Sequence, residues 1–183
     1  KGIYDSKNQI ANFTVRSSIL NEEQYIEGDT LDYNKITGQG KAIGKVIVLD
    51  TAQKSTLYCD KAFYNDKQKT LLAIEKPVLK RVDNQDSIFV RADTFFSAHL
   101  KSTTDTLKTA LKNNNKKANK KKSTSFNIQV ATNVDTTSPK YYSGFHHVRI
   151  FSDSLQGKCD SICFTGKDSI MLMMKMPVLW SRN

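Results

Sequence analysis

Residues 59–79 read CDKAFYNDKQKTLLAIEKPVL, and residues 159–179 read CDSICFTGKDSIMLMMKMPVL. The two stretches align without a gap at an offset of 100 residues, and seven of their 21 positions are identical. Each reads as Cys-Asp, an apolar strand, a polar turn and a second apolar strand that closes in Pro-Val-Leu. An internal repeat of this kind is typical of proteins in which one supersecondary unit stacks on the next.

Shorter copies of the same unit occur elsewhere in the chain. Successive aspartates of the series, Asp29, Asp60 and Asp93, are 31 and 33 residues apart, which allows about two strands per unit. One hairpin cannot bury its apolar face alone, whereas stacked units can bury a continuous apolar interior. The shorter copies are residues 28–33, 92–96 and 152–155.

The hydrophobic period is close to two over most of the chain, which predicts an all-β protein. Turn-forming Gly, Asn and Asp residues separate the alternating stretches. The one helix-like stretch, residues 102–112, runs into a lysine- and asparagine-rich tract, so we expect at most a turn of helix there. Strands are predicted at residues 43–49, 56–64, 70–74, 88–96, 147–151 and 170–180.

The repeated aspartates and prolines mark the ends or bends of the predicted strands. We expect each aspartate to hydrogen-bond backbone amides where a strand begins or bends. A catalytic carboxylate pair or a calcium ladder is the alternative, but the sequence lacks both a partner carboxylate at fixed short spacing and the glycine-dense repeats of calcium-binding β-rolls. Pro77 and Pro177 cannot donate to a ladder, so their strand ends should lie at an edge or a bulge. An edge of this kind can pair with another chain.

The formal charge of +10 is unevenly distributed. Residues 98–126 hold eight lysines and one aspartate, a net +7, so the rest of the chain carries only +3. We interpret residues 98–142 as a flexible lysine- and asparagine-rich insertion within a single domain of residues 1–183. The alternative is a nucleic-acid contact through the lysines of residues 116–122, which salt-dependent binding would reveal. We expect no nucleic-acid partner.

Residues suited to catalysis or metal binding form no known motif in this sequence. The adjacent His146 and His147 should point to opposite faces of a strand, so they cannot chelate one ion together. Nucleophile elbows, zinc-protease motifs and phosphate loops are absent from the sequence. Cys159 and Cys163 lie too far apart along a strand for a disulfide, and we expect them and Cys59 to be buried thiols. The sequence therefore predicts a non-enzymatic protein without metal or cofactor.

The repeat resembles that of the OstA/LptA family of lipopolysaccharide-transport proteins. The run YIEGDTLDYN at residues 25–34, followed by GQGKAIGKV at residues 38–46, resembles the small-Asp-x-x-x-Tyr element, turn and Gly-x-Val strand of that repeat. The units at 59–79 and 159–179 fit the same pattern, and GFHHVRIFSDSLQG at 144–157 resembles the OstA-like members. The resemblance covers most of the chain apart from its start and the lysine-rich insertion.

The resemblance implies an all-β, V-shaped β-jellyroll of stacked antiparallel hairpins that is open at both ends. It also implies a protein that binds the acyl chains of lipopolysaccharide or a related glycolipid and carries it across the periplasm for outer-membrane assembly. The implied partners are other Lpt-type transport proteins, joined through terminal edge strands, and further copies of the chain arranged head to tail. The implied location is the periplasm or the outer membrane, and we expect the signal peptide to lie outside this sequence.

The apolar alternation gives a candidate lipid-binding face. Along residues 170–180 more apolar side chains share one face than a solvent-facing strand would carry, and methionines suit an interior that accepts variable chains. One alternative is a closed core without ligand, because core and groove look alike in sequence. Another is a structural module that assembles through its edge strands. The residues expected to line a lipid-binding groove are Leu31, Tyr33, Ala62, Tyr64, Leu72, Ile74, Phe95, Ile162, Phe164, Leu172, Met174 and Met176.

Overall fold

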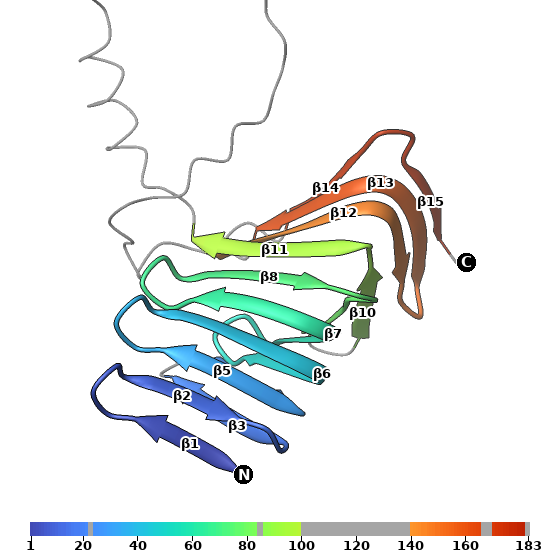
Figure 1. Ribbon diagram of the computed structural model, residues 1–183. Coiled ribbons are helices and arrows are strands. Elements are labelled where there is room, and N and C mark those ends of the chain that lie inside the picture. Colours follow the sequence, from blue (N-terminus) through green and yellow to red (C-terminus); the bar gives the residue numbers. More distant parts are fainter. Residues whose placement is uncertain (22–23, 84–85, 100–139, 166–169, 182–183) are drawn as a thin grey trace, which may run out of the picture.

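The structure is a computed structural model that describes residues 1–21, 24–83, 86–99, 140–165 and 170–181 (Figure 1). These residues form β-strands, turns and bends without any helix, which confirms the all-β prediction. The strands are β1 (Gly2–Asp5), β2 (Ile10–Phe13), β3 (Ser17–Asn21), β4 (Gln24–Gly28), β5 (Thr30–Asn34), β6 (Gln39–Asp50), β7 (Ser55–Asn65), β8 (Thr70–Ile74), β9 (Val78–Asp83), β10 (Asp86–Arg91), β11 (Thr94–His99), β12 (Lys140–Phe151), β13 (Leu155–Thr165), β14 (Met171–Met174) and β15 (Val178–Ser181).

The predicted insertion at 98–142 falls largely outside the described residues. Residues 100–139, which include the helix-like stretch and the lysine tract, are not among them. At the two ends of the insertion, residues 98–99 continue β11 and residues 140–142 begin β12, so the paired strands extend further than predicted. The single-domain assignment and the flexible character of the insertion stay predictions.

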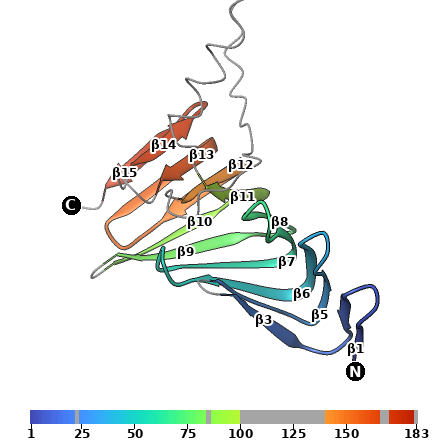
Figure 2. The ribbon, with the colours of Figure 1, turned by 90° about the vertical axis from the view of Figure 1, so that its left-hand side faces the viewer.

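All strands pair antiparallel in one sheet that is folded into two walls. Each of the four long strands, β6, β7, β12 and β13, contributes one half to each wall. Wall A contains β1, β2, β5, β8, β11 and β14 with the 39–43, 61–65, 140–145 and 161–165 halves of the long strands. Wall B contains β3, β4, β9, β10 and β15 with the other halves. The strands stack from β1 to β14 and β15, so the termini lie at opposite ends (Figures 1 and 2).

The chain turns from one wall to the other at a row of corners. In alternate positions the corner consists of two successive residues with positive φ, a conformation that is uncommon for residues other than glycine. In β6 and β12 such a pair is inserted as a bulge, between Ile43 and Val46 and between Phe145 and Val148. The four pairs are Gly44–Lys45, Glu75–Lys76, His146–His147 and Lys175–Met176.

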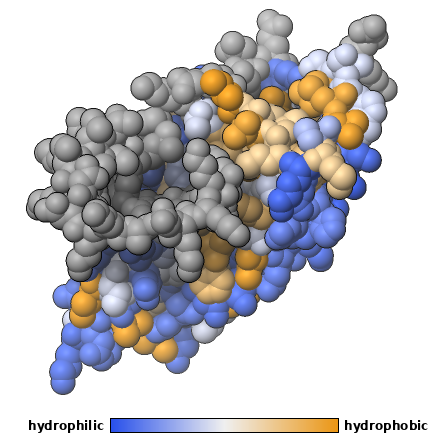
Figure 3. Space-filling view, turned by 90° about the horizontal axis from the view of Figure 1, so that it is seen from above, coloured by the Kyte–Doolittle hydropathy of each residue, from blue (hydrophilic) through white to orange (hydrophobic). Residues whose placement is uncertain are grey.

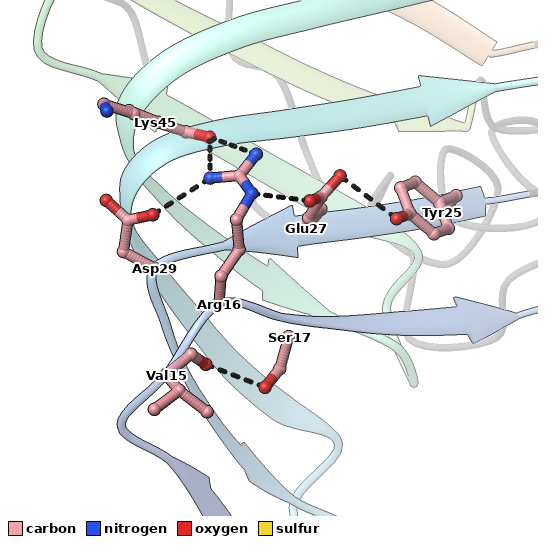
Figure 4. Close-up of polar contacts among 7 residues, drawn as sticks. All are labelled: Val15, Arg16, Ser17, Tyr25, Glu27, Asp29 and Lys45. Atoms are coloured by element: carbon pink, nitrogen blue, oxygen red, sulfur yellow. Dashed lines mark hydrogen bonds and ion pairs between the residues drawn. The ribbon is translucent and has the colours of Figure 1, made fainter. Parts of the chain in front are cut away.

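The repeated aspartates occupy the corners between these pairs. Their backbone N–H groups donate to carbonyls of the neighbouring corner, as Asp60 does to Glu75 at 2.9 Å. Their carboxylates pair with basic side chains of adjacent corners, as Asp29 does with Arg16 at 2.9 Å (Figure 4). The other such pairs are Lys76–Asp60, His147–Asp93, His146–Asp160 and Lys175–Asp160. The aspartates thus lie at bends as predicted, but their side chains bind basic side chains there, in place of the backbone amides that we expected.

Two predicted strands are each divided by a corner. Residues 88–96 belong to β10 and β11, which are separated at Ala92 and Asp93, and residues 170–180 belong largely to β14 and β15. The inward face predicted for the alternating residues of 170–180 is wrong. The chain turns from wall A to wall B at the positive-φ pair Lys175–Met176, and the alternating residues face outward on both walls, as Leu172 and Val178 do. Pro77 and Pro177 directly precede the next strand, where the missing N–H of proline leaves no ladder hydrogen bond unmade.

The corners also separate residues that a straight strand would place on one face. Cys59 and Cys159 are buried thiols as predicted, whereas the burial predicted for Cys163 is wrong, because this thiol is only half-buried. The bend at Asp160 leaves Cys159 in wall B and Cys163 in wall A, so these two do not share a face. The expected opposite faces of the adjacent histidines are likewise wrong, since both stand exposed at one corner.

The core lies between the two walls. Side chains from both walls form one apolar cluster, in which Leu31, Val46, Phe95 and Val148 are at most 2% exposed. Burying an apolar side chain of this size contributes about 1.5–3 kcal/mol. The walls are therefore held together by apolar contact near the corners, and the space between them is called the groove below. Its mouth is the side opposite the corners.

Candidate functional site

The inward faces of both walls are apolar along most of the groove. Cross-strand partners share a face of a sheet, so the register identifies the lining of each wall. On wall A the row nearest the corners includes Leu31, Ala42, Ala62, Ala73, Phe95 and Ile162. The next row includes Tyr33, Tyr64, Leu71, Tyr142, Phe164 and Met171. On wall B a matching row includes Ile26, Val48, Leu57, Leu79, Val90 and Ile150.

The structure separates the predicted lining residues into two groups. The inward group is Leu31, Tyr33, Ala62, Tyr64, Phe95, Ile162 and Phe164. Leu72, Ile74, Leu172 and Met174 lie on the outer face of wall A, and Met176 stands at a corner with 87% of its surface exposed. Leu72 contributes to a surface hollow of about 500 Å³ that it shares with Lys41 and Phe63.

Hairpin register explains why the second strand of each unit was assigned to the wrong face. Asn65 pairs with Thr70, so the four-residue loop between them sets Tyr64 opposite Leu71. The inward residues of β8 are therefore Leu71 and Ala73, and those of β14 are Met171 and Met173. The sequence signal that could have identified these residues is the number of loop residues that follow the inward Tyr64, because this number sets the hairpin register. The wall B lining has no comparable signal, because it depends on where the corners fall.

Two cavities lined by described residues lie at different positions along the mouth of the groove. A cavity of about 230 Å³ lies where β3 and β4 of wall B face β5, β7 and β8 of wall A, with Ile26 and Tyr64 in its lining. A second cavity of about 90 Å³ lies where β9 and β10 face β11 to β14, with Ile88 and Phe164 in its lining. Because the sheet twists, the two walls are offset from each other. At the mouth the strands of wall A therefore face strands of wall B that are not their own continuations, as β7 and β8 face β3 and β4.

A buried polar cluster joins the walls between the two cavities. Lys140 Nζ of wall A donates to Asp50 Oδ2 of wall B at 2.9 Å, and their side chains are 6% and 3% exposed. The hydroxyl of Tyr142 donates to the same carboxylate oxygen at 3.0 Å and lies 3.1 Å from the hydroxyl of Ser55. Burial, followed by the negative charge of Asp50, raises the pKa of Tyr142, so it remains a proton donor. We call these four residues the latch.

Two further side chains place polar atoms in the apolar groove. The guanidinium of Arg81, on wall B, lies 4.0 Å from the ring centroid of Phe164 on wall A, within cation–π range. Tyr64 stacks on Tyr33 with centroids 5.8 Å apart, and its hydroxyl is buried without a hydrogen-bond partner. Gly40 lies directly under the Tyr64 ring, where a Cβ would be 1.9 Å from Cζ. Burial raises the pKa of Tyr64.

The ends of the stack present strand edges with apolar side chains. At one end β1 and β3 each pair with a single neighbour, and at the other end β14 and β15 each pair only with β13 among the described strands. Leu20 of β3 is 79% exposed and Trp180 of β15 is 49% exposed. Apolar side chains are visible among hydrophilic ones in the view from above (Figure 3). These edges have backbone groups available to another strand.

The described part of the chain offers no group of three or more side chains able to hold a metal ion together. At the corners and in the latch, acidic and basic side chains form ion pairs between neighbouring strands or between the walls. Residues 1–21, 24–83, 86–99, 140–165 and 170–181 contain no helix with the length and apolar character that a membrane span requires.

Comparisons with known proteins show a likeness in fold. No family model matches the sequence, and no curated protein matches it. Among solved structures, the chain is similar to LptH from Pseudomonas aeruginosa, described as the LptA-homologous periplasmic component of the lipopolysaccharide transport device. The TM-score is 0.57 at 7% sequence identity, and the match covers 87% of this chain and 95% of that chain. The predicted LptA-type β-jellyroll is thus confirmed as the fold.

Proposed function

We propose that this chain is a non-enzymatic carrier that binds the acyl chains of lipopolysaccharide or a related glycolipid in the groove between walls A and B. The observation that carries the proposal is the apolar lining of both walls along the groove, in a fold shared with a component of a lipopolysaccharide transport device. The proposed location is the periplasm, and the proposed role is delivery of the lipid for outer-membrane assembly.

Apolar burial would supply most of the binding free energy. Each buried methylene contributes about 0.8 kcal/mol, so a chain of about twelve methylenes offers on the order of 10 kcal/mol. An exposed contact between a lysine and a phosphate contributes only about 0–1 kcal/mol and is screened by salt. We therefore expect substitutions of the groove lining to weaken binding far more than substitutions of exposed basic residues.

Photo-crosslinking from adjacent residues tests which face binds lipid. Met173 faces the groove and Leu172 faces outward, and the same relation holds for Leu71 and Leu72. A photoreactive side chain at Met173 or Leu71 should label lipopolysaccharide, and its neighbour should not. Labelling that is equal within each pair would remove the groove as the binding site. Labelling from Leu72 alone would place lipid in the outer hollow.

For the protein partners we propose contact through the terminal edge strands. The support is that β1 and β3 at one end, and β14 and β15 at the other, have one strand neighbour each among the described strands. A second copy or another transport protein would continue both walls by adding strands at these edges. The groove of one molecule would then be continuous with that of the next.

The same edges favour a second candidate function, a structural assembly module that binds no lipid. Light scattering across a range of protein concentrations, with and without lipopolysaccharide, separates the two candidates. Growth in size without lipid uptake would favour the second. The variant Leu20→Lys, at an edge, should reduce assembly, whereas Tyr58→Lys, on the middle of wall B with 42% exposure, should not.

A further inference from the structure

As lined by the described residues, the groove has too little space for the ligand proposed for it. Its two cavities measure about 230 Å³ and 90 Å³, whereas pockets for drug-sized ligands span about 300–1000 Å³. An acyl chain of a glycolipid can therefore enter only if the walls move apart. Whatever joins the walls at the mouth controls that movement, and the latch is the polar contact that does so between the two cavities.

The latch joins the walls through two charges that are both removed from water. Asp50 and Lys140 are 3% and 6% exposed at a distance of 2.9 Å. A buried ion pair contributes little net stability, because the cost of desolvation offsets the attraction, but losing one partner is strongly unfavourable. Lys140 therefore requires an anion at this position, but the anion need not belong to Asp50.

A second cation and an apolar cavity lie beside the latch. Arg81 is the cross-strand partner of Ser55, and it lines the 90 Å³ cavity together with Tyr142 and Phe164. A chain that entered this cavity would bring its headgroup close to Lys140, Arg81 and the Tyr142 hydroxyl. A phosphate has more negative charge and more acceptor oxygens than a carboxylate, so it suits two cations and a hydroxyl donor.

We propose that Asp50 occupies the position of an anionic headgroup, and that a phosphate on the incoming lipid replaces the Asp50 carboxylate at Lys140 while the walls separate. This inference rests on the proposed function and adds to it the headgroup class and the means of opening. The released carboxylate keeps the hydrogen bond from the Gln53 N–H to its Oδ1, 3.0 Å long, at the end of wall B. The exchange replaces one anion by another and leaves no buried charge unpaired.

Probes with a single alkyl chain distinguish recognition of the headgroup from burial of the alkyl chain. Dodecyl phosphate and dodecyl maltoside share one alkyl chain, and inorganic phosphate has none. Each probe is titrated by calorimetry below its micelle concentration into the wild-type chain and into Asp50→Asn, Lys140→Gln and the double variant Asp50→Asn/Lys140→Gln. Lys80→Gln is the matched control, because Lys80 stands over the Phe89 ring next to Arg81 in sequence but on the other face of wall B.

The proposal expects the wild-type chain to bind dodecyl phosphate more tightly than dodecyl maltoside. Asp50→Asn should raise the affinity for dodecyl phosphate about tenfold more than that for dodecyl maltoside. The easier separation of the walls helps both probes, but only the phosphate gains from removal of the competing charged hydrogen-bond acceptor. Lys140→Gln and the double variant should lose the preference for phosphate, whereas Lys80→Gln should keep it. The double variant replaces the ion pair by two neutral amides, so it serves if a single variant does not fold.

Other results would overturn the proposal in distinguishable ways. An equal preference for phosphate in the wild-type chain and the double variant would exclude Lys140 as the headgroup site and leave the proposed function standing. Tight binding of inorganic phosphate would assign the site to free phosphate. Failure of both alkyl probes to bind the wild-type chain would reject the proposed function together with the inference.

Discussion

Replacing Lys140 by methionine tests whether the latch is as buried as its geometry indicates. The substitution keeps an unbranched side chain but leaves the Asp50 carboxylate, 3% exposed, with the Tyr142 hydroxyl and the Gln53 N–H as its donors. Removing one partner of a buried ion pair costs about 3–5 kcal/mol. In a chain of this length each kcal/mol lowers Tm by about 2–4 °C, so the expected decrease is about 6–20 °C.

Urea unfolding followed by far-ultraviolet circular dichroism measures this cost against two comparisons. The double variant Asp50→Leu/Lys140→Met replaces both charges by apolar groups, and its stability should lie within about 1 kcal/mol of wild type or above it. Lys69→Met breaks a pair with Asp66 whose side chains are 31% and 36% exposed, and it should cost about 0–1 kcal/mol. If Lys140→Met costs no more than Lys69→Met, the reasoning about a desolvated latch is refuted.

Burial raises the pKa of Cys59 to about 11, so its alkylation at pH 8 should be slow in the wild-type chain. Alkylation of Cys59 should be faster in Asp50→Asn, because the walls separate more readily without the ion pair, whereas Cys163 on the outer face should react at an unchanged rate. Peptide-resolved mass spectrometry measures both rates. The Ser161 hydroxyl and then Lys175 lower the pKa of Asp160 to about 2. Its contribution to stability is therefore complete above the unfolded pKa of about 4 and is lost as pH falls towards 2. In urea unfolding, the free energies of unfolding of the wild type and of Asp160→Asn should differ at pH 6 and converge at pH 2. Gly40→Ala places a Cβ 1.9 Å from Tyr64 Cζ and should cost about 1–3 kcal/mol in the same assay, and an undiminished cost in a Tyr64→Leu background would show that the ring is not the cause.

The strand content and the stacking could be predicted from the sequence because both depend on local pattern. Alternation in β6, β7 and β8 and the repeated aspartates identified the units, and the inward positions of Leu31, Tyr33, Ala62 and Tyr64 followed from counting from each aspartate. Those residues lie between a corner and the next turn. Within that distance a period of two is reliable, since nothing interrupts the pleat.

The positive-φ corners could not be predicted, because a positive-φ pair leaves the apolar alternation apparently intact. Met174 and Val178 are an even number of residues apart, yet one lies in wall A and the other in wall B. The latch was missed for a different reason. Asp50 and Lys140 are 90 residues apart, and they meet only because the twist offsets the two walls at the mouth. Contacts between layers depend on this geometry, whereas alternation reports only on position within a layer.

The row of corners makes the length of this molecule adjustable by whole units. Each interval from one aspartate to the next, such as Asp29 to Asp60, adds two strands to wall A and two to wall B, because the long strands pass through the bend. With strands about 4.8 Å apart, one interval lengthens the stack by roughly 10 Å. Duplication or loss of such an interval would extend or shorten the groove while preserving both terminal edges, so that molecules of different length would present the same edge strands.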